Sequence, residues 1–222
     1  MQRNDVIQKL GQAAPGIRSA PGTTVPSAVK RPFDAAAEGQ RGDHDLNPGM
    51  HPDRALTAAA VLVPLIERPD GMTVLLTKRT DHLHDHAGQV SFPGGRVDPE
   101  DRDAAAAALR EAREEVGLDP DRVDLIGRLD TYVTRTGFEV VPWVGLVMPP
   151  IALVPDPFEV AEVFEVPLAF FLDPASRKTE SRVWQGKERF FYVYPWHAYY
   201  IWGATAGMLS NLAEVLRANA AG

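Results

Sequence analysis

Three closely spaced glutamates, Glu111, Glu114 and Glu115, are the residues best suited to chemistry in this 222-residue chain. In a helix they gather on one side, because side chains three and four positions apart are neighbours. Like charges at this spacing repel, and they favour the helix only when a cation lies between them. Carboxylate oxygens suit Mg²⁺ or Mn²⁺, and Mg²⁺ commonly works with substrate phosphates. The cluster therefore predicts a divalent-metal site, with a solvated acidic surface as the alternative.

A helix and a glycine turn must position these carboxylates. Asp103 is a favourable N-cap, the alanines at 104–108 favour helix, and Gly117 stands where a helix commonly ends. The apolar face of this helix comprises Ala105, Leu109, Ala112 and Val116. Before it, the turn at 92–95 ends in Gly94 and Gly95, whose missing side chains let the backbone approach the site closely. Both glycines are therefore candidate substrate-binding positions, with a purely structural turn as the alternative.

Composition narrows the function classes. Hydrophobic residues make up 45% of the chain, which supports a folded core, and the net charge is −7 without a long Lys/Arg run. Clustered positive charge is needed to bind a nucleic-acid backbone, so no nucleic-acid partner is expected. The chain has no cysteine, which excludes disulfides and thiol catalysis. No apolar run is long enough to span a bilayer and no signal peptide is evident, so we expect a cytoplasmic protein without a membrane partner.

Periodicity predicts an α+β fold in which a mixed β-sheet packs with helices. Residues 1–53 are interpreted as a largely irregular N-terminal extension with a short helix within 4–12, and 54–222 as the folded domain. Hairpins are expected from 58–66 with 72–78 and from 181–184 with 189–193. The remaining predicted strands are 124–134, 138–147 and 162–166, and the remaining predicted helices are 168–172 and 203–218.

The helix and its preceding loop resemble the Nudix box. The second half of that motif matches at every defined position from Arg110 to Leu118, whereas Asp101 stands where the family has Glu and eight residues rather than seven separate it from Arg110. The resemblance implies a Nudix fold, a mixed β-sheet packed between α-helices in an α/β/α sandwich. It also implies hydrolysis of a diphosphate with Mg²⁺ or Mn²⁺ held by Glu111, Glu114 and Glu115. Arg110 would then orient a carboxylate.

A second resemblance concerns the stretch Leu75–Gly95, which is similar to the element of the coenzyme A pyrophosphatase branch of that family. The spacing is kept throughout, but Thr80 replaces a small Ser or Ala and His84 replaces an Arg. Histidine has a pKa near neutrality, so this replacement removes a permanent cation. The resemblance implies hydrolysis of coenzyme A or acyl-CoA to 3′,5′-ADP and 4′-phosphopantetheine or its acyl form. The alternatives are a broader nucleoside-diphosphate hydrolase for NADH or ADP-ribose, and a non-catalytic binding module.

Several further residues are candidates for contact with an anionic substrate or for catalysis. Lys78, Arg79 and His84 are expected near the substrate phosphates, together with the two glycines. In Nudix enzymes the general base is a box glutamate or an acid from a later loop. Glu114 and Glu115 are therefore candidates, as are Glu159 and Glu162 after the proline-rich break at 149–157, and the sequence favours Glu162.

Two other patterns receive a structural interpretation. His82, His84 and His86 alternate, but their polar neighbours indicate a loop, so a zinc site is disfavoured. The aromatic residues between 190 and 202 are expected to form core or a homodimer interface. Stacking on an adenine is the less favoured alternative.

Overall fold

A computed structural model describes residues 1–13, 39–50, 52–82 and 88–218. His84 and His86 lie outside the described residues, so the predictions made for them cannot be placed in the fold. The helices are α1 (Arg3–Ala13), α2 (Ala104–Val116), α3 (Leu168–Leu172) and α4 (Gly203–Arg217). The strands are β1 (Gln40–Gly42), β2 (Thr57–Arg68), β3 (Gly71–Arg79), β4 (Val90–Ser91), β5 (Gly94–Arg96), β6 (Val123–Arg128), β7 (Thr131–Val133), β8 (Phe138–Val147), β9 (Val160–Pro167), β10 (Lys178–Trp184), β11 (Lys187–Trp196) and β12 (Tyr199–Trp202).

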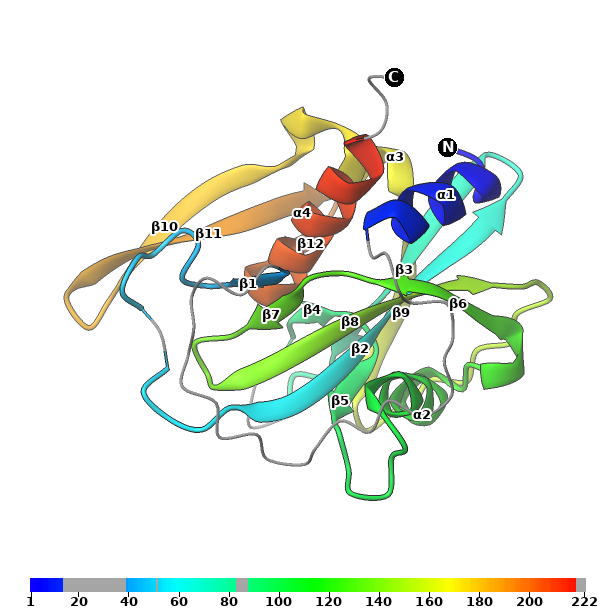
Figure 1. Cartoon of the computed structure of the whole chain (residues 1–222), viewed down its shortest axis with the longest axis horizontal. Helices are drawn as coiled ribbons and strands as arrows, with labels where there is room; N and C mark the ends of the chain where they lie inside the picture. The colour runs from blue at the N-terminus through cyan, green and yellow to red at the C-terminus, as the bar shows by residue number, and fades with distance from the viewer. Residues whose placement is uncertain (14–38, 51, 83–87, 219–222) are drawn as a thin grey trace.

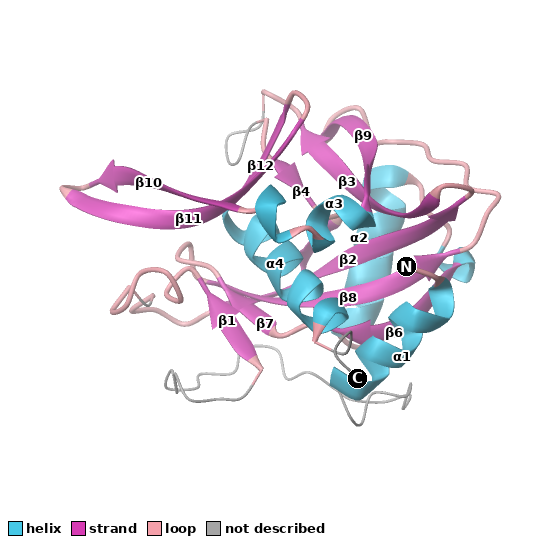
Figure 2. Ribbon diagram, turned by 90° about the horizontal axis from the view of Figure 1, so that it is seen from above, coloured by secondary structure: helices cyan, strands magenta, loops and turns pink. Residues whose placement is uncertain are grey.

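A mixed nine-stranded sheet forms the centre of the molecule. β2 and β8 run parallel over 57–66 and 138–147, β2 forms the expected hairpin with β3, and β9 lies antiparallel to β3. Helix α2 covers one face of the sheet, and α1, α3 and α4 lie on the other (Figure 1; Figure 2). This arrangement confirms the predicted α+β class and the α/β/α sandwich.

Alternation along β2 divides the core between the two faces. Ala60, Leu62 and Ile66 pack with α2, whereas Val63 and Leu65 pack with the helices opposite. Successive side chains of a strand point to opposite faces, so one apolar strand supplies both cores. The alanines of α2 (Ala104, Ala107, Ala108 and Ala112) are buried, and their small size brings the helix close to the sheet.

The segment predicted as one strand over 124–134 is divided into β6 and β7, both antiparallel to β8. Leu129 still donates from its backbone N–H to Pro142 of β8, but the N–H of Asp130 donates to the side chain of Asn211 on α4. The chain therefore leaves the β8 ladder where a helix side chain offers a competing acceptor. The other expected strands and helices are confirmed within a few residues at their ends.

The N-terminal region contributes to the core. Helix α1 confirms the short helix expected within 4–12, and its Val6 and Leu10 are buried beside β6 and α4. Lys9 donates from Nζ to the carbonyl of Leu216 on α4 at 2.6 Å. β1 pairs parallel with β7. β1 is not predicted from the sequence, because it lies in the extension interpreted as irregular. A division of the chain at residue 53 remains a prediction, and these contacts join the described parts of both segments.

A second, three-stranded antiparallel sheet consists of β10, β11 and β12. The long β10–β11 hairpin projects from the body of the molecule (Figure 1; Figure 2). Its aromatic residues divide between two environments, because Tyr194 is buried in the core whereas Trp184 near the tip is 53% exposed. None of the helices in the described parts of the chain has the length and apolar character to cross a membrane.

Candidate active site

Helix α2 carries the three glutamates between well-formed caps. The Asp103 side chain accepts a hydrogen bond from the N–H of Ala106 at 2.8 Å, and Gly117 ends the helix with φ 68°. This left-handed conformation is open to glycine at little cost and is what ends the helix here. The loop that follows β8 returns to this end, where the N–H of Asp156 donates to the carbonyl of Glu115 at 2.9 Å. The C-terminal turn of α2 therefore positions the loop that carries Glu159.

The Gly94–Gly95 turn lies directly against the carboxylates. The N–H of Gly94 donates to Oε2 of Glu115 at 3.2 Å. A Cβ atom at Gly95 would lie 2.5 Å from the carboxyl carbon of Glu111, and one at Gly94 would lie 2.4 Å from the carbonyl oxygen of Ala60 on β2. Any side chain here would displace backbone or carboxylate. Both glycines are thus required by close packing, in addition to any contact with substrate.

Arg110 connects the helix with the loop that contains the extra residue. Its guanidinium donates to Asp101 at 2.8 and 2.9 Å, to Glu111 at 2.9 Å and to Glu114 at 3.0 Å. It also donates to the carbonyl of Arg96 at 3.1 Å. The bond from Arg110 lowers the pKa of Asp101 and keeps it charged. These contacts support the proposed orienting role of Arg110. They also show that Asp101, which stands where the motif has a glutamate, is a hydrogen-bond partner of this arginine.

Glu115 is the most deeply buried of the three glutamates, with 6% of the residue exposed. Burial raises the pKa of its carboxyl to about 8, against the opposing effects of the Gly94 N–H and Arg79. Burial also raises the pKa of Glu111, and the charges of Glu114 and Glu159 act in the same direction. A carboxylate in this environment is short of compensating positive charge. A divalent cation would supply it.

Arg79, at the end of β3, lies between two of the acids. One guanidinium nitrogen is 3.7 Å from Glu115 and another is 3.8 Å from Glu159. Thr80 holds the acidic loop in place, because its hydroxyl donates to the carbonyl of Phe158 at 2.8 Å and its N–H donates to that of Glu159 at 3.0 Å. Glu159 therefore joins the group formed by the box glutamates and Arg79.

Glu162 and Lys78, two further candidates from the sequence, face each other in the β3–β9 ladder. The Glu162 carboxylate accepts a hydrogen bond from the hydroxyl of Tyr199, whose ring stacks on Phe164. The sequence favours Glu162 as the later acid, whereas the structure brings Glu159 beside the carboxylates. The position of Glu159 depends on the path of the loop over the end of α2, and the spacing of the two acids from the prolines does not reveal that path.

The carboxylate oxygens of Glu111, Glu114 and Glu115 are ligands of the kind that a hard divalent cation prefers. Within the ranges that the structure describes, no three acidic or histidine side chains converge closely enough to enclose a metal unaided. Glu114 is drawn toward Arg110 and its side chain is 59% exposed, whereas Glu111 and Glu115 flank the glycine turn. Mg²⁺ is commonly held by one or two carboxylates and completed by substrate phosphates and water. Glu111 and Glu115 fit that role, with Glu114 within one helical turn of both.

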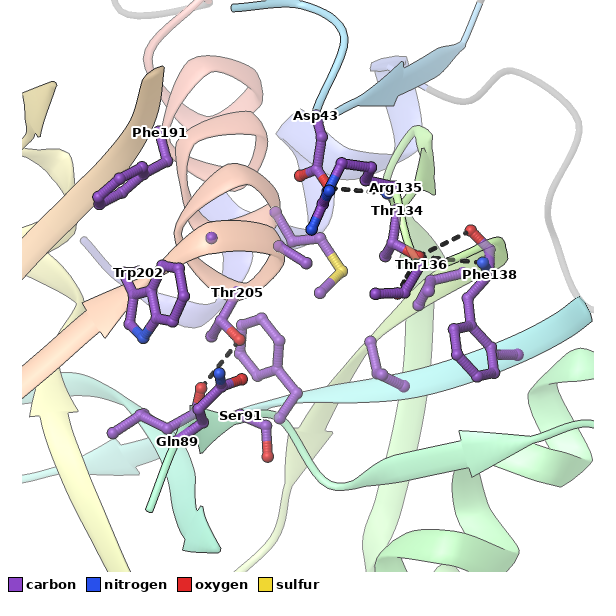
Figure 3. A pocket seen from close by; sticks show the side chains of 18 of the residues that line it. Asp43, Gln89, Ser91, Thr134, Arg135, Thr136, Phe138, Phe191, Trp202 and Thr205 are labelled. Carbon is purple, nitrogen blue, oxygen red and sulfur yellow. Dashed lines mark hydrogen bonds between the residues drawn. The ribbon is translucent and has the colours of Figure 1, made fainter. Parts of the chain in front are cut away.

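A cavity of about 620 Å³ opens beside this group, on the α4 face of the sheet. Arg79, Gly94 and Gly95 belong to its wall, and Lys78 is absent from the described lining residues. Figure 3 shows Phe191 and Trp202 on one side of the cavity and the Thr134–Phe138 turn on the other. A volume within roughly 300–1,000 Å³ is typical of small-molecule sites. The cavity therefore has the size and aromatic walls to hold a nucleotide.

Comparison with known proteins finds one family model and relatives that carry the same family description. The family model described as NUDIX domain matches residues 56–185. The protein "Nudix hydrolase 15, mitochondrial" of Arabidopsis thaliana is 39% identical over 164 residues, a match that covers 71% of this chain and 58% of that protein. The "Uncharacterized Nudix hydrolase NudL" of Cronobacter sakazakii is 45% identical, with 70% of this chain and 80% of that protein covered.

Among solved structures, a crystal structure of a MutT/nudix family protein from Enterococcus faecalis is similar to 74% of this chain and 63% of that one. Its TM-score is 0.48 and its sequence identity is 18%.

Proposed function

The chain belongs to the Nudix hydrolase family, and on that premise we propose that it hydrolyses the diphosphate of coenzyme A or an acyl-CoA. Enzymes of this family act on phosphoanhydride bonds of nucleoside-diphosphate compounds. The products here would be 3′,5′-ADP and 4′-phosphopantetheine, or its acyl form. The observation that carries the proposal is that Arg79, Gly94 and Gly95, which contact the carboxylates of Glu111 and Glu115, also line a nucleotide-sized cavity. Arg79 and residues 89–92, 94 and 95 of the coenzyme A element line the same cavity, which supports the choice of substrate.

Glu111 and Glu115 would hold the metal, Mg²⁺ or Mn²⁺, with Glu114 as a third ligand or as part of the catalytic acid–base machinery. When bound, the metal neutralises diphosphate charge and lowers the pKa of a water molecule. The Gly94 and Gly95 backbone lets the diphosphate approach the carboxylates without a side chain in between. Arg79, whose guanidinium lies 3.7 Å from Glu115, would offer a cation to the same phosphates.

A general base must accept the proton of the attacking water. Glu159 is the acid beside Glu115 and Arg79, and its side chain is 43% exposed, which leaves it accessible to solvent. Glu162, which the sequence favours, lies on β9 and accepts a hydrogen bond from Tyr199. We therefore propose Glu159 as the first candidate and retain Glu162 as the second. Glu115 itself is a third, because it is a box glutamate whose carboxylate lies 3.7 Å from Arg79.

The test is product analysis by chromatography with coenzyme A, NADH and ADP-ribose in parallel, each with Mg²⁺ or Mn²⁺. We expect coenzyme A to be cleaved fastest and 3′,5′-ADP to appear. Faster cleavage of NADH or ADP-ribose would keep the family chemistry and overturn the coenzyme A assignment. Absence of cleavage of all three with either metal would favour a binding module.

Two expectations about cellular context remain proposals. A cytoplasmic location agrees with a small-molecule substrate and with the absence of a membrane-spanning helix from the described residues. A homodimer would cover some of the exposed apolar side chains of the β10–β11 hairpin, among them Val183 and Trp184.

A further inference from the structure

Two arginines face each other across the β10–β11 hairpin. Arg182 and Arg189 are directly paired in the antiparallel register, and both line the cavity. Like charges directly opposite each other destabilise a strand pair. The Nε and Nη1 atoms of Arg189 are also buried, and among the described residues they have no hydrogen-bond partner. Buried donors on a charged group are normally satisfied, so this arrangement calls for an anionic acceptor.

The surroundings of this pair add positive charge and aromatic surface. The Arg182 guanidinium lies 5.5 Å from the ring centre of Trp202 and 5.8 Å from that of Phe191. Arg135, from the turn before β8, lines the same cavity, and its guanidinium is 5.4 Å from the ring centre of Trp184. These contacts hold two of the three cations over aromatic rings, where they remain available to a ligand.

Negative charge does not balance this group of arginines. Within the described lining, Asp43 is the one acidic residue. Its carboxylate already accepts a hydrogen bond from the backbone N–H of Arg135 at 2.8 Å (Figure 3). It also accepts one from the hydroxyl of Tyr132 at 2.8 Å. The hairpin wall of the cavity is therefore cationic, whereas the wall next to Gly94 and Gly95 adjoins the glutamates.

We propose that Arg182, Arg189 and Arg135 form a second anion subsite that holds a phosphomonoester of the substrate. This inference rests on the proposed function, since coenzyme A has a 3′-phosphate besides its diphosphate, whereas NADH and ADP-ribose lack one. A phosphomonoester has close to two negative charges near neutral pH. One guanidinium group can donate two parallel hydrogen bonds to two of its oxygens. Phe191 and Trp202 would flank the attached nucleoside. The subsite gives the enzyme a means to prefer substrates with a remote phosphate.

The test compares kcat/KM for coenzyme A and 3′-dephospho-CoA, which differ in this phosphate alone. We expect the wild-type protein to prefer coenzyme A by at least about tenfold, the effect of one charge-assisted hydrogen bond. Arg189→Gln and Arg182→Gln should abolish that preference, with a loss of kcat/KM at least about tenfold larger on coenzyme A than on 3′-dephospho-CoA. Lys187→Gln is the charge-matched control, because Lys187 lies on the same hairpin and is absent from the described cavity lining. Arg189→Lys should restore part of the preference.

An equal loss on both substrates, or a wild-type protein without preference, would overturn the subsite even if coenzyme A is the substrate. Calorimetric titration with adenosine 3′,5′-bisphosphate and with AMP tests the subsite without turnover. We expect tighter binding of the bisphosphate to the wild-type protein and equal binding of the two nucleotides to Arg189→Gln. Equal binding to the wild-type protein would overturn the proposal. If the binding preference is found but coenzyme A is not cleaved, the proposed function fails and the subsite stands.

Discussion

Gly95 lies so close to Glu111 that a Cβ atom on the glycine would be 2.5 Å from the carboxyl carbon of the glutamate. The two residues come from different elements, β5 and α2, so their contact sets the distance between the glycine turn and the acidic helix. Glu111 also accepts a hydrogen bond from the Arg110 guanidinium at 2.9 Å. The carboxylate therefore has little freedom to move away from a side chain placed at position 95.

Gly95→Ala should lower kcat by about a hundredfold, because a displacement near 1 Å at a catalytic group has effects of this size. The reason is displacement of Glu111 and not a loss of stability. Gly127→Ala is the matched control, since a Cβ atom there would meet Leu10 at an ordinary 3.4 Å. Steady-state kinetics and thermal unfolding of both variants provide the measurement. Equal activities for the two variants would show that Glu111 tolerates the displacement.

Glu115→Gln should remove most turnover, by about a hundredfold or more, because the change deletes one charge from the proposed metal site and almost no volume. Glu115 is buried and its pKa is raised to about 8, so the neutral glutamine should leave the melting temperature unchanged or higher. Calorimetric titration with Mn²⁺ should show weakened binding. Glu67→Gln, an exposed position on β2, is the control. Near-normal Mn²⁺ affinity in Glu115→Gln would contradict the ligand assignment.

Glu159→Gln and Glu162→Gln distinguish the two candidates for the general base. We expect the first to lower kcat by about a hundredfold, as loss of a general base typically does, and the second to have little effect. The reason is that Glu159 shares Arg79 with Glu115, whereas Glu162 is engaged by Tyr199. Rate–pH profiles of both variants are the measurement. The reverse order of effects would restore Glu162 as the base.

Leu10→Ala should lower the free energy of unfolding by about 2–5 kcal/mol, as truncation of a buried leucine commonly does. Leu10 is 1% exposed, whereas Ile7 on the same helix is 36% exposed, so Ile7→Ala is the matched control. Urea unfolding gives the stability, and kcat should change in neither variant. A Leu10→Ala protein as stable as Ile7→Ala would show that α1 does not contribute to the core in solution.

The Arg68–Glu165 pair predicts a pH-dependent contribution to stability. Arg68 donates to Glu165 at 2.5 and 3.0 Å, and this bond lowers the pKa of Glu165 below its ordinary 4.5. The Arg68–Glu165 contribution to stability is therefore complete above the pKa that Glu165 has in the unfolded state. It is lost as the pH falls through the lower pKa that Glu165 has in the folded state. Glu165→Gln should cost about 1 kcal/mol at pH 7, because both side chains are partly exposed. Urea unfolding below pH 4.5 should show the difference shrinking toward zero, and a constant difference would refute the linkage.

Much of the local structure follows from the sequence because its causes are local. The N-cap Asp103, the alanine run and Gly117 predict α2, and its observed bounds agree with them. The β2–β3 hairpin and helix α4 are likewise predictable from apolar patterns and turn residues. The split between β6 and β7 is not, because it depends on Asn211, which approaches Asp130 only in the folded protein.

The sequence by itself determined which carboxylates gather on α2, since helical periodicity fixes neighbours three and four residues apart. It also indicated that glycines precede them. The tertiary structure alone decided that Arg79 and Glu159 join Glu115, because that grouping depends on the β3–β9 register and on the loop over the end of α2. It likewise brought the β10–β11 hairpin to the cavity wall. Contacts between distant parts of a chain depend on packing and register, which a local pattern does not specify.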